Sequence, residues 1–166
     1  AWTTEVHGER SSATLARMYF ARACALLART PSLTAEHVHA LVPRCGSLEE
    51  AAEPHPEVLA EIELPRAACQ FLAAPDAGAI DADLKWLRSC GAAMIPCTVP
   101  EYPPLLAQTQ RAPAVLYVLG DTDVLPSSQI AIVGSRMASS GGLGTARSFA
   151  ADVARFGLTI TSGLAL

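Results

Sequence analysis

The strongest constraint on the fold of this chain is a strand–loop–helix–strand pattern close to its last residue. Residues 130–133 form a short apolar run that leads into a Gly-Ser-Arg sequence at 134–136. A helical pattern follows over 143–156, and a second β-type run occupies 158–161. A helix of this length between two strands predicts a right-handed parallel crossover. We therefore expect an α/β fold, the first part of a parallel sheet. The expected buried face of the helix carries Ala146, Phe149, Ala150, Val153 and Ala154.

The preceding part of the chain has a different pattern, in which proline and glycine separate several short amphipathic segments. Thr34 and Ser47 are expected N-caps, and Pro43 is expected to end a helix. The expected helices cover 12–29, 35–42, 48–52, 56–63, 65–73 and 81–90. Short β-type runs follow at 92–97 and 114–119. We expect a loose N-terminus over 1–11, a helical domain over 12–90 and a partial α/β domain over 91–166.

Composition narrows the possible functions. The net charge is −4, and residues 91–166 carry four acidic and four basic side chains, so the broad positive field of many nucleic-acid-binding proteins is missing. No apolar run is long enough to span a bilayer, and the first residues do not resemble a signal peptide. The five cysteines include no Cys-x-x-Cys pair, which argues against a disulfide framework or a zinc site and favours a reducing cytosol.

The loop after the first of these two strands has the chemistry of an anion site. Loops that follow parallel strands lie where ligands bind in α/β sheets, and this one leads into a helix N-terminus. Gly134 allows close approach of a ligand, Ser135 and Ser139 offer hydroxyl donors, and Arg136 offers a charge-assisted contact. A purely structural turn remains the alternative. The glycines do not fit a dinucleotide fingerprint, and no Walker A sequence occurs.

A second loop is expected beside the first. Ser162 and Gly163 directly follow the next strand, and in a parallel crossover that strand's end lies next to Gly134. Both loops could then line one pocket, although a plain turn is an equal alternative. His37 and His39 are two residues apart, so they do not form a ligand pair on a helix. We expect no metal site, cofactor or catalytic residues.

Several segments in a fixed order resemble the DNA-processing protein A (DprA/Smf) family. They cover 83–87, 101–106, 113–120, 130–136 and 157–165. The resemblance implies a helical, SAM-like N-terminal domain before a Rossmann-like parallel sheet. It implies binding of single-stranded DNA in the cytoplasm, protection of incoming strands and loading of the RecA recombinase during natural transformation. It also implies a homodimer, whose interface we expect in family segments that follow position 166.

By position, the resemblance places Gly134, Ser135 and Arg136 on a DNA phosphate, with Ser139 as a further hydroxyl and Ser162 and Gly163 in the second loop. The sequence departs from the family pattern at three places. Met137 stands where a second basic residue is common, and Gly141 stands where an aromatic residue is usual. Residues 31–33 lack the glycines of a DNA-binding hairpin.

Two other function classes remain open. One is a Rossmann-like enzyme of the nucleoside-monophosphate phosphoribohydrolase type, which requires a carboxylate facing the glycosidic bond; none lies beside either loop in the sequence. The other is an interaction protein that uses the acidic stretch from Glu49 to Glu63 to bind a basic partner.

Overall fold

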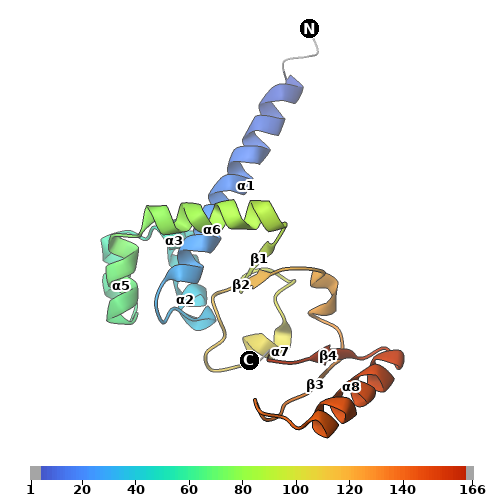
Figure 1. Ribbon diagram of the computed structural model, residues 1–166. Helices are drawn as coiled ribbons and strands as arrows, with labels where there is room; N and C mark the ends of the chain where they lie inside the picture. Colours follow the sequence, from blue (N-terminus) through green and yellow to red (C-terminus); the bar gives the residue numbers. More distant parts are fainter. Residues whose placement is uncertain (1–4, 164–166) are drawn as a thin grey trace. The chain divides into compact units, whose positions relative to one another are not determined.

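A computed structural model describes residues 5–163, with side chains from Thr14 onward (Figure 1). The described chain contains α-helices and short strands, so the predicted mixed α/β class is confirmed. It divides into two compact units, Ala1–Asp121 and Thr122–Leu166. Among the described residues, no helix has both the length and the apolar character that crossing a membrane requires.

The first unit is mainly helical. Its elements are α1 (Glu5–Arg29), α2 (Ala35–Cys45), α3 (Leu48–Ala52), α4 (Pro56–Glu61), α5 (Arg66–Ala73), α6 (Ala77–Cys90), β1 (Ala93–Pro96), α7 (Pro104–Ala107) and β2 (Val115–Val118). The expected helix over 12–29 therefore begins earlier, at Glu5. Residues 1–4 of the expected loose N-terminus lie outside the described residues.

The core of this unit surrounds the second half of α1. Ala23, Cys24, Ala25, Leu26 and Leu27 are buried there, because α3, α6 and the two strands pack against this part of α1. The neighbouring elements contribute small and branched apolar side chains to the same core. These are Val38, Leu41, Ala51, Ala68 and Ile80. Burial of this apolar area supplies the main favourable term for folding of the unit.

The strands of the first unit explain why its boundary differs from the expected division after residue 90. β1 and β2 pair antiparallel, with Ala93 opposite Val118 and Pro96 opposite Val115. Ile95 and Val115 are buried, and both strands pack against α1. Residues 91–121 are therefore part of the same compact unit as the helices.

The end of α2 corrects one prediction. Pro43 does not end the helix, which continues to Cys45. Proline in the last turn removes a single backbone donor, and the rest of the turn is held by other bonds. The Arg44 guanidinium donates to the Ala40 carbonyl at 2.8 Å, and the Gly46 amide donates to the Val42 carbonyl at 2.8 Å. Gly46 has a φ of +102°, a conformation that favours glycine and turns the chain.

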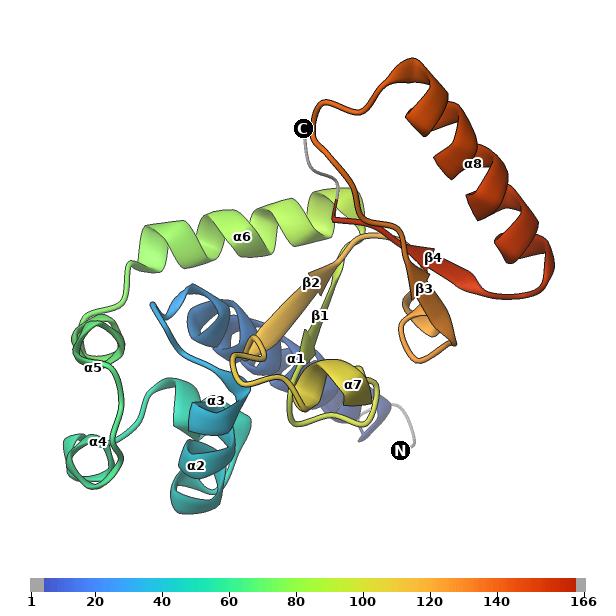
Figure 2. The same cartoon turned by 90° about the horizontal axis from the view of Figure 1, so that it is seen from below.

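The second unit contains η1 (Thr122–Val124), β3 (Gln129–Ala131), α8 (Ser140–Arg155) and β4 (Thr159–Thr161). β3 and β4 pair in parallel, with Ile130 opposite Ile160, and α8 connects them (Figure 2). The predicted parallel strand–helix–strand arrangement is therefore confirmed. The first unit's strands form a separate antiparallel pair, so the described residues contain two small sheets.

The predicted burial of the second unit is wrong. No residue of α8 is buried, and Val133, which follows β3, is 87% exposed. Of the expected buried face, Ala146, Ala150 and Val153 are half-buried, whereas Phe149 and Ala154 are exposed. The cause is that two strands of three residues each cover only a narrow stripe of a 16-residue helix.

Candidate functional site

The loops that follow β3 and β4 leave the same end of the parallel pair. Ala131 is paired with Thr161, and the Ile132 amide donates to the Thr161 carbonyl at 2.8 Å. Gly134 follows two residues after Ile132, while Ser162 and Gly163 directly follow Thr161. The structure therefore brings the start of the first loop close to the second loop, and all the predicted site residues are exposed.

Both serines of the first loop hold its backbone through their hydroxyl oxygens. Ser135 Oγ accepts a hydrogen bond from the Met137 amide at 3.1 Å. Ser139 is the N-cap of α8, and its Oγ accepts from the Gly142 amide at 3.1 Å. A hydroxyl that accepts in this way still has its own proton to donate. Each serine can therefore shape the loop and bind an oxyanion at the same time.

The first turn of α8 adds main-chain donors to this loop. The amides of Ser140 and Gly141 precede the first intrahelical hydrogen bonds, so they have no acceptor within the helix. The aligned peptide dipoles place a partial positive charge at the same end. The hydroxyl proton of Ser139, these amides and the helix dipole therefore all present positive partial charge, which would attract an anion at this end of α8.

Gly134 is not required by its surroundings. Its φ is not in the left-handed region, and a Cβ placed on it would meet nothing within 4 Å among the described residues. Gly141 and Gly163 have the same open surroundings. Local packing therefore does not require glycine at these three positions. The open space around them lets a ligand approach the main chain.

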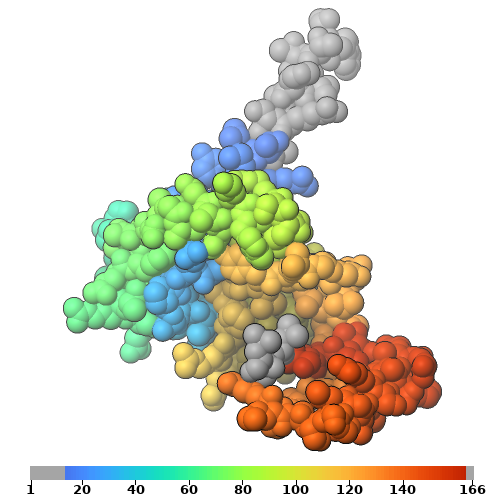
Figure 3. All heavy atoms as spheres, in the orientation of Figure 1, coloured from blue at the N-terminus to red at the C-terminus, as the bar shows by residue number. Residues whose placement is uncertain are grey.

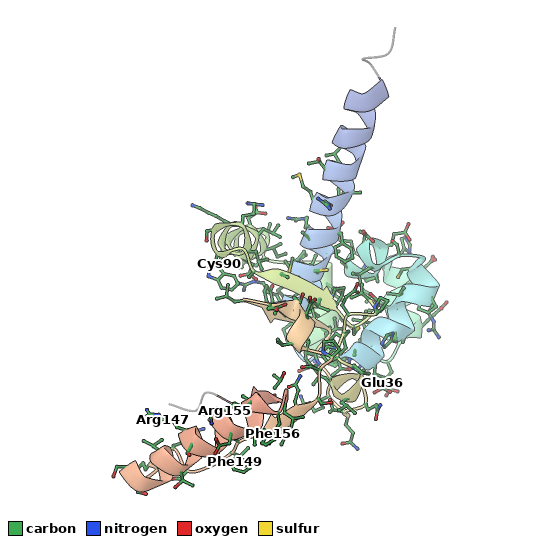
Figure 4. The ribbon with its side chains drawn as sticks, turned by 90° about the vertical axis from the view of Figure 1, so that its right-hand side faces the viewer. Glu36, Cys90, Arg147, Phe149, Arg155 and Phe156 are labelled. Carbon is green, nitrogen blue, oxygen red and sulfur yellow. The ribbon has the colours of Figure 1, made fainter. Side chains whose placement is uncertain are left out.

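Arg136 extends from the exposed part of the loop. Arg136 is the basic residue of this loop. Within residues 14–163, its guanidinium has no hydrogen bond or ion pair to another side chain. The neighbouring α8 shows the contrast: Arg155 donates to Asp152 at 2.7 Å, so its charge is already balanced (Figure 4). Arg136 is therefore available to an external anion.

The described residues do not assemble a metal centre: no group of three or more His, Cys, Asp or Glu side chains lies together among them. Displaced pKa values are found in the first unit. Burial raises the pKa of Cys24 to about 12 and that of Cys97 to about 11, which keeps both thiols protonated and inert.

Sequence reasoning missed three features that the structure reveals. His37 is half-buried and accepts a hydrogen bond at Nδ1 from the Thr34 amide at 3.0 Å, so it caps α2. Asp83, expected near a helix start, lies inside α6 and binds Arg29. Arg147 is a second exposed cation on α8 (Figure 4). A Thr-x-x-His pattern could have indicated the cap; a contact 54 residues apart, as between Arg29 and Asp83, leaves no local signal.

Comparison with known proteins shows which family the sequence of this chain matches. Residues 93–166 match the model of a family described as DNA recombination-mediator protein A. Protein Smf of Escherichia coli (strain K12) is 41% identical to this chain over 100 residues, which are 60% of this chain and 26% of that protein. The match thus spans about a quarter of the length of this curated relative. No solved structure matches the chain.

Proposed function

We propose that this chain, as a member of the DNA recombination-mediator protein A (DprA/Smf) family, has a DNA-processing role in recombination and binds single-stranded DNA through the loops after β3 and β4. In this proposal, a backbone phosphate lies against the start of α8. Arg136, the hydroxyls of Ser135 and Ser139 and the first amides of α8 donate to its oxygens. Ser162 and Gly163 form the other side of the site.

The unpaired guanidinium of Arg136 is the observation that carries the proposal. An exposed arginine with no carboxylate partner within residues 14–163 keeps its full charge for an external ligand. Its planar group binds two oxygens of a phosphate at once, which an ammonium group does not. A structural role would instead have placed this side chain against one of the protein's own acids or carbonyls.

The distribution of charge supports the same location. The second unit, residues 122–166, contains three arginines and two aspartates, whereas the first unit contains nine basic and fourteen acidic side chains. Nucleic acid is therefore attracted to the second unit and repelled by most of the first. With few cations available, the affinity depends on a small number of phosphate contacts.

The family pattern extends the proposal to the biological role. We infer that the bound strand is protected and presented to the RecA recombinase during natural transformation, in the cytoplasm and by a homodimer. No carboxylate stands beside either loop in the sequence, so the role is proposed as non-catalytic. Release of adenine from AMP by the purified protein would instead support the phosphoribohydrolase alternative.

The test is an Arg136→Ala variant of the full chain, titrated with a fluorescent oligothymidine in an anisotropy assay. Loss of a charge-assisted contact is expected to weaken binding by roughly tenfold or more. The slope of log affinity against log salt is expected to fall by about 0.7, the value for one phosphate on a single strand.

Arg111→Ala is the matched control, because Arg111 is an exposed arginine of the first unit and its loss changes net charge equally. The control is expected to keep nearly all of the affinity. Circular dichroism of both variants should match the parent chain. Equal affinities of the parent chain and the Arg136→Ala variant would overturn the proposal.

A further inference from the structure

A second surface with the features of a nucleic-acid contact lies entirely within the first unit. Its two aromatic side chains are Trp86 of α6 and Tyr117 of β2, which contact each other and are 48% and 36% exposed. Figure 3 shows the atoms of α6 directly against those of the described part of α1. Together with Arg22, Arg29 and Lys85, these side chains form what is named here the aromatic–cationic face.

The acids of this surface are neutralised by arginines of α1. Asp83 accepts two hydrogen bonds from Arg29, from Nε at 2.6 Å and from Nη2 at 2.7 Å. Asp81 lies 3.4 Å from Arg22 Nη1. Lys85, one turn beyond Asp81 and next to Trp86 in sequence, has no such partner among the described residues. Within the described part of this face, each carboxylate therefore has an arginine partner, and Lys85 is a cation without one.

The charge balance of this face differs from that of the remainder of the first unit. The face contains three basic and two acidic side chains, whereas the other parts of residues 1–121 contain six basic and twelve acidic ones. A polyanion is consequently repelled from most of this unit and accepted on the α1–α6 side.

The aromatic pair is held in place before any ligand arrives. Tyr117 donates its hydroxyl proton to Asp83 Oδ2 at 3.1 Å, and Arg29 holds both oxygens of the same carboxylate. The rings of Trp86 and Tyr117 are 6.4 Å apart and inclined at 59°. In this tilted arrangement the two rings support each other while Trp86 stays half exposed, so a flat ligand can stack on it without rearranging the pair.

We propose that the aromatic–cationic face is a second contact for single-stranded DNA, in which a base stacks on Trp86 while the adjoining backbone passes Lys85 and Arg22. Aromatic platforms beside cations bind single strands regardless of sequence, because every base has a flat face. Duplex DNA is excluded, since its bases are already stacked on one another. The inference rests on the proposed function and adds a base contact to the phosphate contacts of the second unit.

Tryptophan fluorescence provides a direct test on the full chain. The chain has two tryptophans, so Trp2→Phe leaves Trp86 as the only reporter. Oligothymidine is expected to quench the emission of Trp86 with the same midpoint as the anisotropy change. An abasic oligonucleotide of equal length is the control: it is expected to bind through its phosphates and leave the emission unchanged.

Variants separate stacking from charge. Trp86→Leu is expected to weaken binding of oligothymidine by roughly 5- to 150-fold, the range for one stacked base, while Trp86→Phe retains most of the affinity. Lys85→Gln is expected to lower the salt slope by about 0.7, whereas Arg111→Gln leaves it unchanged. Lys85 is exposed, so its variant reports on binding even if the Trp86→Leu variant fails to fold.

The outcomes distinguish the two proposals. Binding that depends on Arg136 but leaves Trp86 emission unchanged, with full affinity in the Lys85→Gln and Trp86→Leu variants, overturns this inference and leaves the proposed function standing. Absence of any binding by the parent chain contradicts the proposed function and this inference with it.

Discussion

The side chain of Asp83 joins three elements of the first unit. It lies on α6, accepts two hydrogen bonds from Arg29 of α1, and accepts a third from Tyr117 of β2. Hydrogen bonding from the Arg29 guanidinium lowers the pKa of Asp83. Burial, together with the charge of this carboxylate, raises the pKa of Tyr117 to about 12. Near neutral pH the cluster therefore contains a carboxylate, a guanidinium and a protonated phenol.

The first prediction concerns the Asp83→Asn variant and acid. A carboxylate whose pKa is lowered by folding adds stability above its unfolded pKa of about 3.9, and this stability is lost as the pH falls through the lower folded pKa. Asp83→Asn is therefore expected to reduce the free energy of unfolding at pH 7, by about 1 kcal/mol because the pair is partly exposed. As the pH falls through the lowered pKa of the folded state, the difference from the parent chain should shrink.

Urea unfolding at pH 7 and at pH 2.5 is the measurement. Glu101→Gln, a neutralised acid at an exposed position, is the control and should unfold like the parent chain at both values. A stability difference of the same size at both pH values would show that the ionised pair does not stabilise the unit.

Side-chain caps set where several helices begin. Ser47 accepts from the Glu50 amide at 3.1 Å at the start of α3, as its Ser-x-x-Glu pattern predicts. Asp76 does the same for α6 by accepting from the Ala79 amide at 3.0 Å. The sequence placed that start at Asp81, because Ala77, Gly78 and Ala79 carry no apolar periodicity; a capping aspartate was the signal that was missed.

Replacement of this cap is the second prediction. Asp76→Ala is expected to lower the free energy of unfolding by about 1 kcal/mol, because the Ala79 amide loses its acceptor. Asp76→Ser keeps an acceptor at the same position and should recover most of the loss. Thermal unfolding followed by circular dichroism measures both, and equal melting temperatures for the two variants would contradict the role of the cap.

Features of the fold that depend on local sequence could be predicted, whereas features that depend on distant contacts could not. The order of strands and helices in the second unit follows from local periodicity and turn residues. The closeness of Gly134 and Ser162 followed from the rule that parallel strands end together. Burial of Phe149 was predicted wrongly, because periodicity shows which face of a helix is apolar and not whether anything covers it.

The two compact units differ in how deeply they are packed. The first has a buried core around α1, with Leu26, Leu41 and Ile80 almost fully enclosed. In the second, α8 has no buried residue and Val133 and Phe156 are exposed. Since apolar burial supplies most of the stability of a fold, the first unit is the more stable of the two.

Hydrogen exchange on the full chain tests this difference. Amides of α8 are expected to exchange faster than those of α2, whose Ala35, Val38 and Leu41 are buried. Peptides from 140–155 and 35–45 can be followed by mass spectrometry in the same sample. Equal protection of the two helices would show that the second unit is stabilised by more than its own packing.

The short parallel pair of the second unit has a further consequence for the protein in solution. Among the described residues, β3 and β4 bond only to each other, so each strand has an outer side with unpaired amides and carbonyls. The strand sequences, Gln129–Ala131 and Thr159–Thr161, contain no charged residue or proline, the usual guards against intermolecular strand pairing. Each outer side is therefore able to accept a further strand by main-chain hydrogen bonds, whether that strand comes from the same protein or from another chain.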